Sequence, residues 1–213
     1  MVGLWWSPTT RLTVLRVQGV PAYERDRIRL AAQSIKDVPR LRANPFLLRS
    51  IVLESSAVES VDYRANIFGR GVMSVQYKRP VAVIGSESGL MLSSSGQVFS
   101  SKVKVAGLPV IVPPQSTTEQ NLSIVGGWRS REAAALCSAI GISLPDLNWR
   151  VGISRTGFVN LVPGTGARVE LGSLDGSKAK IAALSKILKD DPTLLTKISK
   201  LTLYSPEKPL VER

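Results

Sequence analysis

The sequence predicts an α+β protein made of two consecutive domains. Residues 60–67 alternate polar and apolar side chains without interruption, and the pattern resumes in residues 73–78 after a glycine-containing turn, which is typical of a half-buried β-hairpin. Upstream of this hairpin, apolar residues recur with helical spacing in two segments. Downstream, most segments alternate again as strands do. One sheet covered by two helices, followed by a mostly β region, is an α+β arrangement.

The first predicted domain covers residues 11–80 and has the element order β-α-α-β-β. Residues 12–18 favour a strand that stops at Gly19, and a helix opens at 21–23. Asn44 is a good N-cap before Pro45, so a second helix is predicted at 45–56. Pro80 would interrupt a central strand, and the domain is predicted to end there. The residues expected to face the sheet are Ile28, Ala31, Ala32, Ile35, Leu48, Ile51 and Val52.

The second predicted domain covers residues 81–213 and is mostly strand, with two helices. Ser130 is expected to cap the first of these helices and Gly141 to close it, with Cys137 as an inert thiol on its apolar stripe. The remaining elements are predicted as strands at 81–84, 89–92, 97–100 and 149–154, a strand containing Val169 and Leu171, a loop at 113–127, a helix near 177–189 and a final strand at 198–204.

Composition restricts the possible chemistry more than it restricts the fold. The 213 residues contain 44% hydrophobic and 21% charged residues, which is ordinary for a folded protein. The chain has no histidine, which excludes Ser-His and Cys-His catalysis and histidine-based zinc sites. Its single cysteine, Cys137, cannot form an intramolecular disulfide. Catalysis by paired carboxylates or by lysine stays possible in principle, but the sequence offers little to support it, and we expect no catalytic residue, no metal site and no cofactor.

Two glycine-rich segments and one carboxylate pair do not change this expectation. Residues 69–71 and 164–166 lack the spacing and the Lys-Ser/Thr ending of a phosphate-binding loop, so they are interpreted as turns between strands. Asp190 and Asp191 end a helix directly before Pro192 and are interpreted as a solvated helix end.

The net charge of +12 favours an anionic neighbour, such as nucleic acid, an anionic membrane or an acidic envelope polymer. No stretch of eighteen apolar residues is present, so the chain as given is expected to be soluble. Residues 1–10 form an N-terminal arm with Trp5 and Trp6 side by side. These tryptophans resemble an interfacial belt that follows a missing membrane helix, or else the arm packs on the domain behind it.

Over nearly its full length the sequence resembles the extracytoplasmic part of FtsQ/DivIB bacterial division proteins. Residues 14–19 (VLRVQG) match the opening strand and glycine of a POTRA domain, and residues 77–82 (YKRPVA) match the junction into the family's β domain. Residues 95–99 (SGQVF) and 168–172 (RVELG) resemble later elements, although Ser95 replaces the usual aspartate. Residues 198–213 resemble the terminal strand and exit. The family's cytoplasmic tail and membrane helix have no counterpart here, which a start codon assigned too far downstream would explain.

The resemblance implies a non-enzymatic scaffold at the extracytoplasmic (periplasmic) face of the cell membrane. Its POTRA domain would recruit other divisome members, and its last strand would pair with FtsB/FtsL-like proteins, so that septum formation is coordinated. An exposed sheet edge offers unpaired N–H and C=O groups to such a partner strand. The alternative is that this strand is internal and Tyr204 is a surface aromatic. The partner-binding residues that the resemblance implies are Lys200, Leu201, Thr202, Leu203, Tyr204 and Ser205, with Leu201 and Leu203 inward and Lys200, Thr202 and Tyr204 outward.

Other functional classes have weaker support. A basic nucleic-acid-binding protein is the main alternative, but aromatic residues make up only 6% and do not interleave with basic residues as a stacking platform would. A hydrolase without histidine would need a Ser-Lys arrangement, and no such motif stands out. A POTRA protein of outer-membrane assembly would require a C-terminal barrel that this sequence does not contain.

Overall fold

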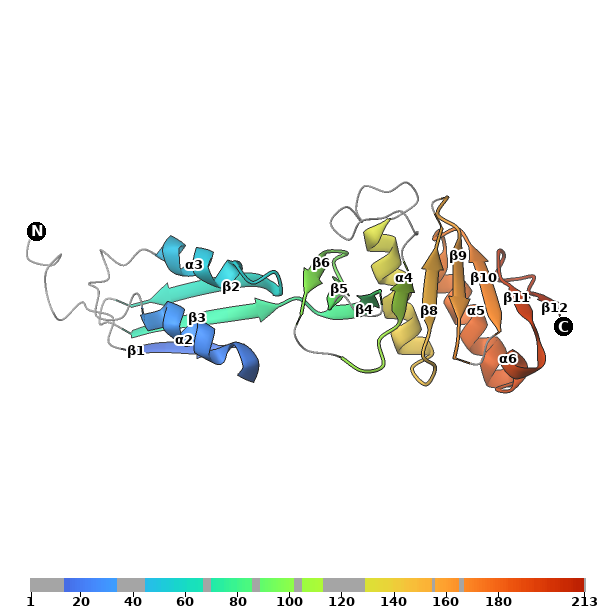
Figure 1. The fold of residues 1–213 in the computed structure, drawn as a ribbon, viewed down its shortest axis with the longest axis horizontal. Helices are drawn as coiled ribbons and strands as arrows, with labels where there is room; N and C mark the ends of the chain where they lie inside the picture. The colour runs from blue at the N-terminus through green and yellow to red at the C-terminus, as the bar shows by residue number, and fades with distance from the viewer. Residues whose placement is uncertain are drawn as a thin grey trace, which may run out of the picture. The chain divides into compact units, whose positions relative to one another are not determined.

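A computed structural model of the chain describes residues 14–33, 45–66, 70–85, 89–101, 105–112, 129–154, 156–164 and 167–212. The chain divides into two compact units, Met1–Lys78 and Arg79–Arg213, so the predicted boundary after residue 80 lies two residues from the observed one. Each unit combines helices with its own β-sheet, which confirms the predicted α+β class (Figure 1).

The first unit is a three-stranded sheet with the strand order β1-β3-β2. β1 pairs in parallel with β3, and β2 and β3 form the predicted antiparallel hairpin, with Val61 opposite Val75 and Tyr63 opposite Met73. Its elements are β1 (Val14–Gln18), a short 3-10 helix η2 (Ala22–Glu24), α2 (Arg25–Gln33), α3 (Pro45–Leu53), β2 (Val58–Ala65) and β3 (Arg70–Tyr77).

Both helices of the first unit pack on the same face of this sheet. Ile28 and Ala31 of α2 and Val52 of α3 lie in one buried cluster with Met73 and Val75 of β3. These positions were predicted from helical spacing and strand alternation, and they are confirmed. Ile35, Asn44 and the side chain of Leu48 lie outside the described residues.

Gly19 ends β1 where no other residue fits. Its φ is +80°, and a Cβ built on it would lie 2.2 Å from the carbonyl oxygen of Val75. Residues other than glycine rarely adopt this φ, and a backbone oxygen cannot shift without distorting the chain around it. The glycine therefore allows the chain to turn closely over β3 before α2 begins.

The second unit is a nine-stranded sheet with the order β12-β11-β10-β9-β8-β7-β4-β5-β6. Two long helices connect parallel neighbours: α4 joins β7 to β8, and α5 joins β10 to β11. Its elements are β4 (Pro80–Ile84), β5 (Leu90–Ser93), β6 (Val98–Ser100), β7 (Val110–Val112), α4 (Ser130–Ser143), β8 (Arg150–Ile153), β9 (Val159–Val162), β10 (Arg168–Gly172), α5 (Ser177–Asp190), α6 (Leu194–Lys197), β11 (Lys200–Thr202) and β12 (Leu210–Glu212).

The core of the second unit lies between this sheet and its helices. Leu136 and Cys137 of α4 and Ile181 of α5 are buried in one cluster with Val151 and Leu161 of the sheet. Burial raises the pKa of the Cys137 thiol to about 12, as expected of an inert core thiol. The helices predicted to begin at Ser130 and near residue 177 are present, and Cys137 lies on the buried side of the first of them.

Several predictions for the second unit need correction. Ser130 is the first residue of α4 rather than its cap, and the helix continues past Gly141 to Ser143. Three short elements were not predicted, namely β7, the four-residue helix α6, and β12. The first and last hold only three residues each, which is too short for alternation to be visible in the sequence. The loop predicted at 113–127 and the arm at 1–10 lie outside the described residues.

The turn between β5 and β6 forms although Ser95 stands where an aspartate was expected. The hydroxyl of Ser93 accepts a hydrogen bond from the Gln97 backbone N–H at 2.9 Å and lies 2.9 Å from the Ser95 hydroxyl. The Gly96 N–H donates to the Ser93 carbonyl at 2.9 Å. Serine side chains therefore stabilise this turn in place of a carboxylate.

Among the helices in the described parts of the chain, none combines the length and the apolar character needed to cross a membrane.

Candidate functional site

The final strand of the sheet was expected to be β11, but β11 is internal. It pairs in parallel with β10 and antiparallel with β12, so its backbone is bonded on both sides. Leu201 and Leu203 are fully buried in the helix-side core and Thr202 is also buried. The prediction that Lys200–Ser205 is an open edge is therefore wrong, because a second strand follows and covers it.

The edge of the sheet next to β11 is β12, and β6 forms the opposite edge (Figure 1). Lys200 lies opposite Glu212 and Thr202 lies opposite Leu210. Leu210 is 65% exposed and Val211 49% exposed. The sequence gives little sign of this strand, since Leu210 and Val211 are a single apolar pair and seven residues separate β12 from β11.

The hydrogen bonds of β11 indicate which backbone groups of β12 face outward. The Ser199 carbonyl accepts from the Arg168 N–H at 3.0 Å, and the Leu203 N–H donates to the Glu170 carbonyl at 2.7 Å. Residues 199 and 203 therefore direct these groups toward β10, so Lys200 and Thr202, which alternate with them, face β12. The Ser199 N–H donates to the Glu212 carbonyl of β12 at 3.1 Å, so Glu212 faces β11, and strand alternation directs the N–H and C=O of Val211 away from the sheet.

Tyr204 lies two residues after the end of β11, and its side chain is held against β10. Its hydroxyl donates to Glu170 Oε2 at 2.8 Å, and its ring meets Phe158 edge to face, with centroids 5.7 Å apart. The ring also lies over Gly172, where a Cβ would approach the Tyr204 ring to 3.0 Å. The side chain is still 54% exposed, so a partner could cover the rest of the ring.

A chain of charges links Tyr204 to the edge strand. Glu170 is buried and forms ion pairs with Arg168 and Lys200, each at 3.4 Å, and Lys200 also reaches Glu212 of β12 at 3.4 Å. The hydrogen bond from Tyr204, supported by Lys200 and Arg168, lowers the pKa of Glu170. The same bond raises the pKa of Tyr204, because ionised tyrosine could not donate it. Burial would lower the pKa of Lys200, but Glu170 and Glu212 outweigh it and raise this pKa.

A small cavity of about 170 Å³ lies next to Tyr204. Lys180 from α5 lies along it and donates to the Leu171 carbonyl at 2.8 Å and to the Ser173 carbonyl at 2.9 Å. Burial lowers the pKa of Lys180. The lysine thereby holds the end of β10 against α5 and positions Gly172 beneath the tyrosine ring. The cavity is lined by Phe158, Leu171, Gly172, Ser173, Lys180 and Tyr204.

Two of the predicted site residues are therefore exposed to a partner, and others are buried and cannot contact one. Tyr204 and Ser205 are exposed beside the edge, and Lys200 is half-buried at it, whereas Leu201, Thr202 and Leu203 are buried. Leu210, Val211 and Glu212 were missed. Within the described part of the chain, no group of three or more acidic or cysteine side chains could hold a metal ion. The arrangement offers backbone hydrogen-bonding groups and an aromatic surface to a partner.

No family model matches this chain, and none of the curated proteins matches it significantly.

Proposed function

We propose that this protein is a non-enzymatic scaffold of the FtsQ/DivIB type that coordinates septum formation in bacterial cell division. In this proposal, the second unit binds an extended strand of an FtsB/FtsL-like partner, and the first unit recruits other divisome members. The observation that carries the strand site is the open edge of β12, where the backbone groups of Val211 point away from the sheet. The exposed ring of Tyr204 beside β11 would serve as the aromatic anchor.

The order of elements supports the assignment of the first unit as a POTRA domain. A strand, two helices and a hairpin follow one another along the chain. The second strand of the hairpin, β3, pairs in parallel with β1. We propose the same localisation as for that family, at the extracytoplasmic face of the cell membrane.

The test is a titration of the full chain against the FtsB/FtsL-like coiled-coil pair of its own genome. Val211→Pro removes the outward N–H, while Val211→Ala removes only side-chain atoms and serves as its matched control. We expect at least a tenfold loss, roughly 1.4 kcal/mol or more, for the proline variant and little loss for the alanine variant. Circular dichroism checks that each variant folds.

Tyr204→Ala tests the aromatic anchor separately. We expect a loss of about 2 kcal/mol in binding if the ring is a hot spot. Tyr204→Phe keeps the ring and loses the hydroxyl, so it should bind nearly as well. Deleting residues 198–213 would also remove the buried Leu201 and Leu203, so a deletion of residues 210–213 is the sharper truncation. Absence of binding by the wild-type chain, or equal binding by Val211→Pro and Val211→Ala, would refute the strand site.

A further inference from the structure

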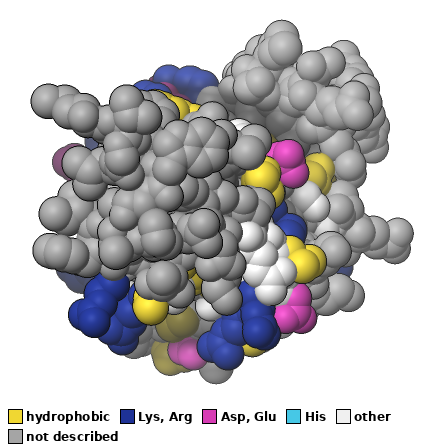
Figure 2. Space-filling view, turned by 90° about the vertical axis from the view of Figure 1, so that its left-hand side faces the viewer, with side chains coloured by type: hydrophobic (Ala, Val, Ile, Leu, Met, Phe, Trp, Pro, Cys, Tyr) yellow, Lys and Arg dark blue, Asp and Glu magenta, His cyan; other side chains and the backbone are white. Residues whose placement is uncertain are grey.

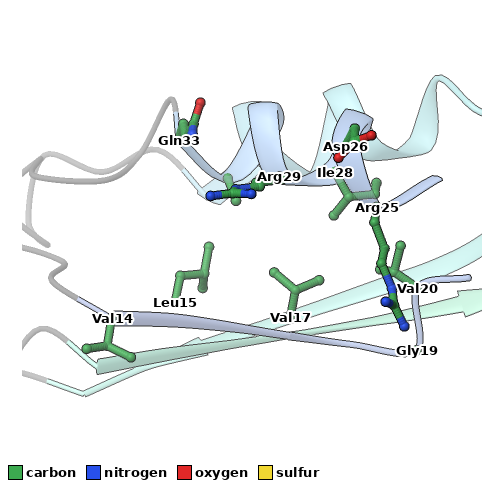
Figure 3. Close-up of a pocket in the computed structure, with 11 residues that line it drawn as sticks. Val14, Leu15, Val17, Gly19, Val20, Arg25, Asp26, Ile28, Arg29 and Gln33 are labelled. Carbon is green, nitrogen blue, oxygen red and sulfur yellow. The ribbon is translucent and has the colours of Figure 1, made fainter. Parts of the chain in front are cut away.

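The first unit has an open sheet edge of its own beside a large groove. β1 is the outer strand of the three-stranded sheet, and among the described residues only β3 pairs with it. Between β1 and α2 lies a cavity of about 830 Å³. Leu15 and Val17 project from β1 toward α2, whereas Val14 points away from the helix (Figure 3). The groove is lined by Val14, Leu15, Val17, Gly19, Val20, Arg25, Asp26, Ile28, Arg29, Ala32 and Gln33.

The floor of the groove is apolar and incompletely covered. Leu15, Val17 and Val20 pack against the core of this unit but remain only half-buried. Removing such side chains from water stabilises a complex by about 25 cal/mol per Å² of apolar area. A segment lying in the groove would complete this part of the core and could at the same time pair with the edge of β1.

The α2 rim of the groove carries more positive than negative charge. Arg25 and Arg29 are exposed on α2 and line the groove, while Asp26 is the only acidic residue among the groove residues. Arg25 extends from the start of α2 toward Val20 and Gly19 (Figure 3). In the view of Figure 2, Lys and Arg side chains gather along the lower border with hydrophobic side chains between them.

These charges select among possible occupants. A second copy of the chain would bring its own net charge of +12 toward Arg25 and Arg29. Like charges in direct opposition disfavour such a pair. Nucleic acid would gain from the arginines but not from the apolar floor. An extended protein segment with acidic residues uses both features.

We propose that the groove between β1 and α2 binds an extended protein segment in which apolar residues alternate with acidic residues, as an added strand on β1. β1 has five residues and spans about 17 Å, and α2 has nine and spans about 14 Å, so the segment is about five to seven residues long. This inference names the docking site of the first unit and rests on the proposed scaffold role only in taking the occupant to be a protein.

The probe is a fluorescent seven-residue peptide of alternating leucine and glutamate, titrated against the full chain by fluorescence anisotropy. We expect saturable 1:1 binding that weakens with added salt. A peptide with lysine in place of every glutamate should bind at least about tenfold more weakly, because it meets the arginines with like charge. No saturable binding of the glutamate peptide, or equal binding of both peptides, overturns the proposal.

Two matched comparisons locate the site. Arg29→Glu reverses a charge at the groove, and Arg49→Glu makes the same change at an exposed position on α3 outside it. We expect Arg29→Glu to weaken binding about five- to tenfold and Arg49→Glu to leave it nearly unchanged. In the peptide, N-methylation of one alternate set of amides should abolish binding and of the other set should not, as strand addition requires. Equal effects in either comparison would overturn the proposal.

The variant Val211→Pro separates this site from the edge of the second unit. It should leave peptide binding unchanged, because Val211 belongs to β12. Loss of peptide binding in this variant would show that the peptide binds the edge of the second unit and not the groove of the first, which would overturn the proposal. If the FtsB/FtsL-like pair fails to bind while the peptide binds as expected, only the division assignment fails.

Discussion

Each unit packs helices against a sheet, but the two units bury very different amounts of apolar surface. Among the described residues, seven buried side chains form the core of the first unit and 26 form that of the second. In the first unit the side of the sheet at β1 is incompletely covered, and the groove lies there. In the second unit, fully buried side chains such as Trp149 and Leu171 close the core.

This difference is physically informative because small cores leave little margin of stability. The first unit leaves part of the apolar surface in its groove exposed to water. A partner segment that covered this surface would add to the unit's stability. The large unit does not need a partner to complete its core. It presents instead a three-residue strand, β12, whose contribution would come mainly from backbone hydrogen bonds. The two open edges therefore favour different modes of binding.

The largest expected effect concerns Gly19. Gly19→Ala places a methyl group 2.2 Å from the Val75 carbonyl at a φ of +80°, and we expect the first unit to lose more than about 3 kcal/mol of unfolding free energy. Gly107→Ala is the matched control, because φ is +78° there and no atom lies within 4 Å of the added Cβ. It should cost about 1 kcal/mol.

Hydrogen exchange followed by mass spectrometry measures the protection of backbone amides in each unit separately, in both glycine variants. Residues 14–33 should lose protection in Gly19→Ala while residues 129–212 keep it. Equal losses for the two glycine variants would show that the close approach to Val75 is not what requires Gly19.

Truncation of one core residue in each unit sharpens the comparison. Met73 and Leu136 are both fully buried, one in each core. Met73→Ala and Leu136→Ala should each cost about 2–5 kcal/mol of the unfolding free energy of their own unit. Because the first core is smaller, we expect Met73→Ala to unfold its unit at a lower urea concentration than Leu136→Ala unfolds the other. If each variant shifted both transitions equally, the units would be a single cooperative body.

The smallest expected effect is a pH dependence confined to the second unit. The pKa of Glu170 is lowered in the folded state, so its contribution to stability is present above its unfolded pKa of about 4.3 and is lost as the pH falls through the folded pKa. Glu170→Gln should cost under about 1 kcal/mol at pH 7 and should no longer differ from wild type well below pH 4. Urea titrations at several pH values measure this difference. A deficit that grew at low pH would contradict the assigned sign.

The sequence by itself determined those features that depend on local patterns. Alternation predicted the hairpin of β2 and β3 and the strand β8, and helical spacing predicted α2, α4 and α5. Gly19 was also recognisable, because a glycine directly after a strand signals a turn. Each of these features follows from the side-chain period of a strand or a helix, which neighbouring residues reveal without any long-range contact.

Only the tertiary structure decided which strand forms the edge and what surrounds it. β12 is too short to show a period, and its pairing with β11 converts the predicted edge into an internal strand. The hydrogen bond between Tyr204 and Glu170 joins residues 34 positions apart, and the groove exists only because α2 and β1 meet in space. Such features depend on strand order and on nonlocal pairing, and no pattern of neighbouring residues encodes them.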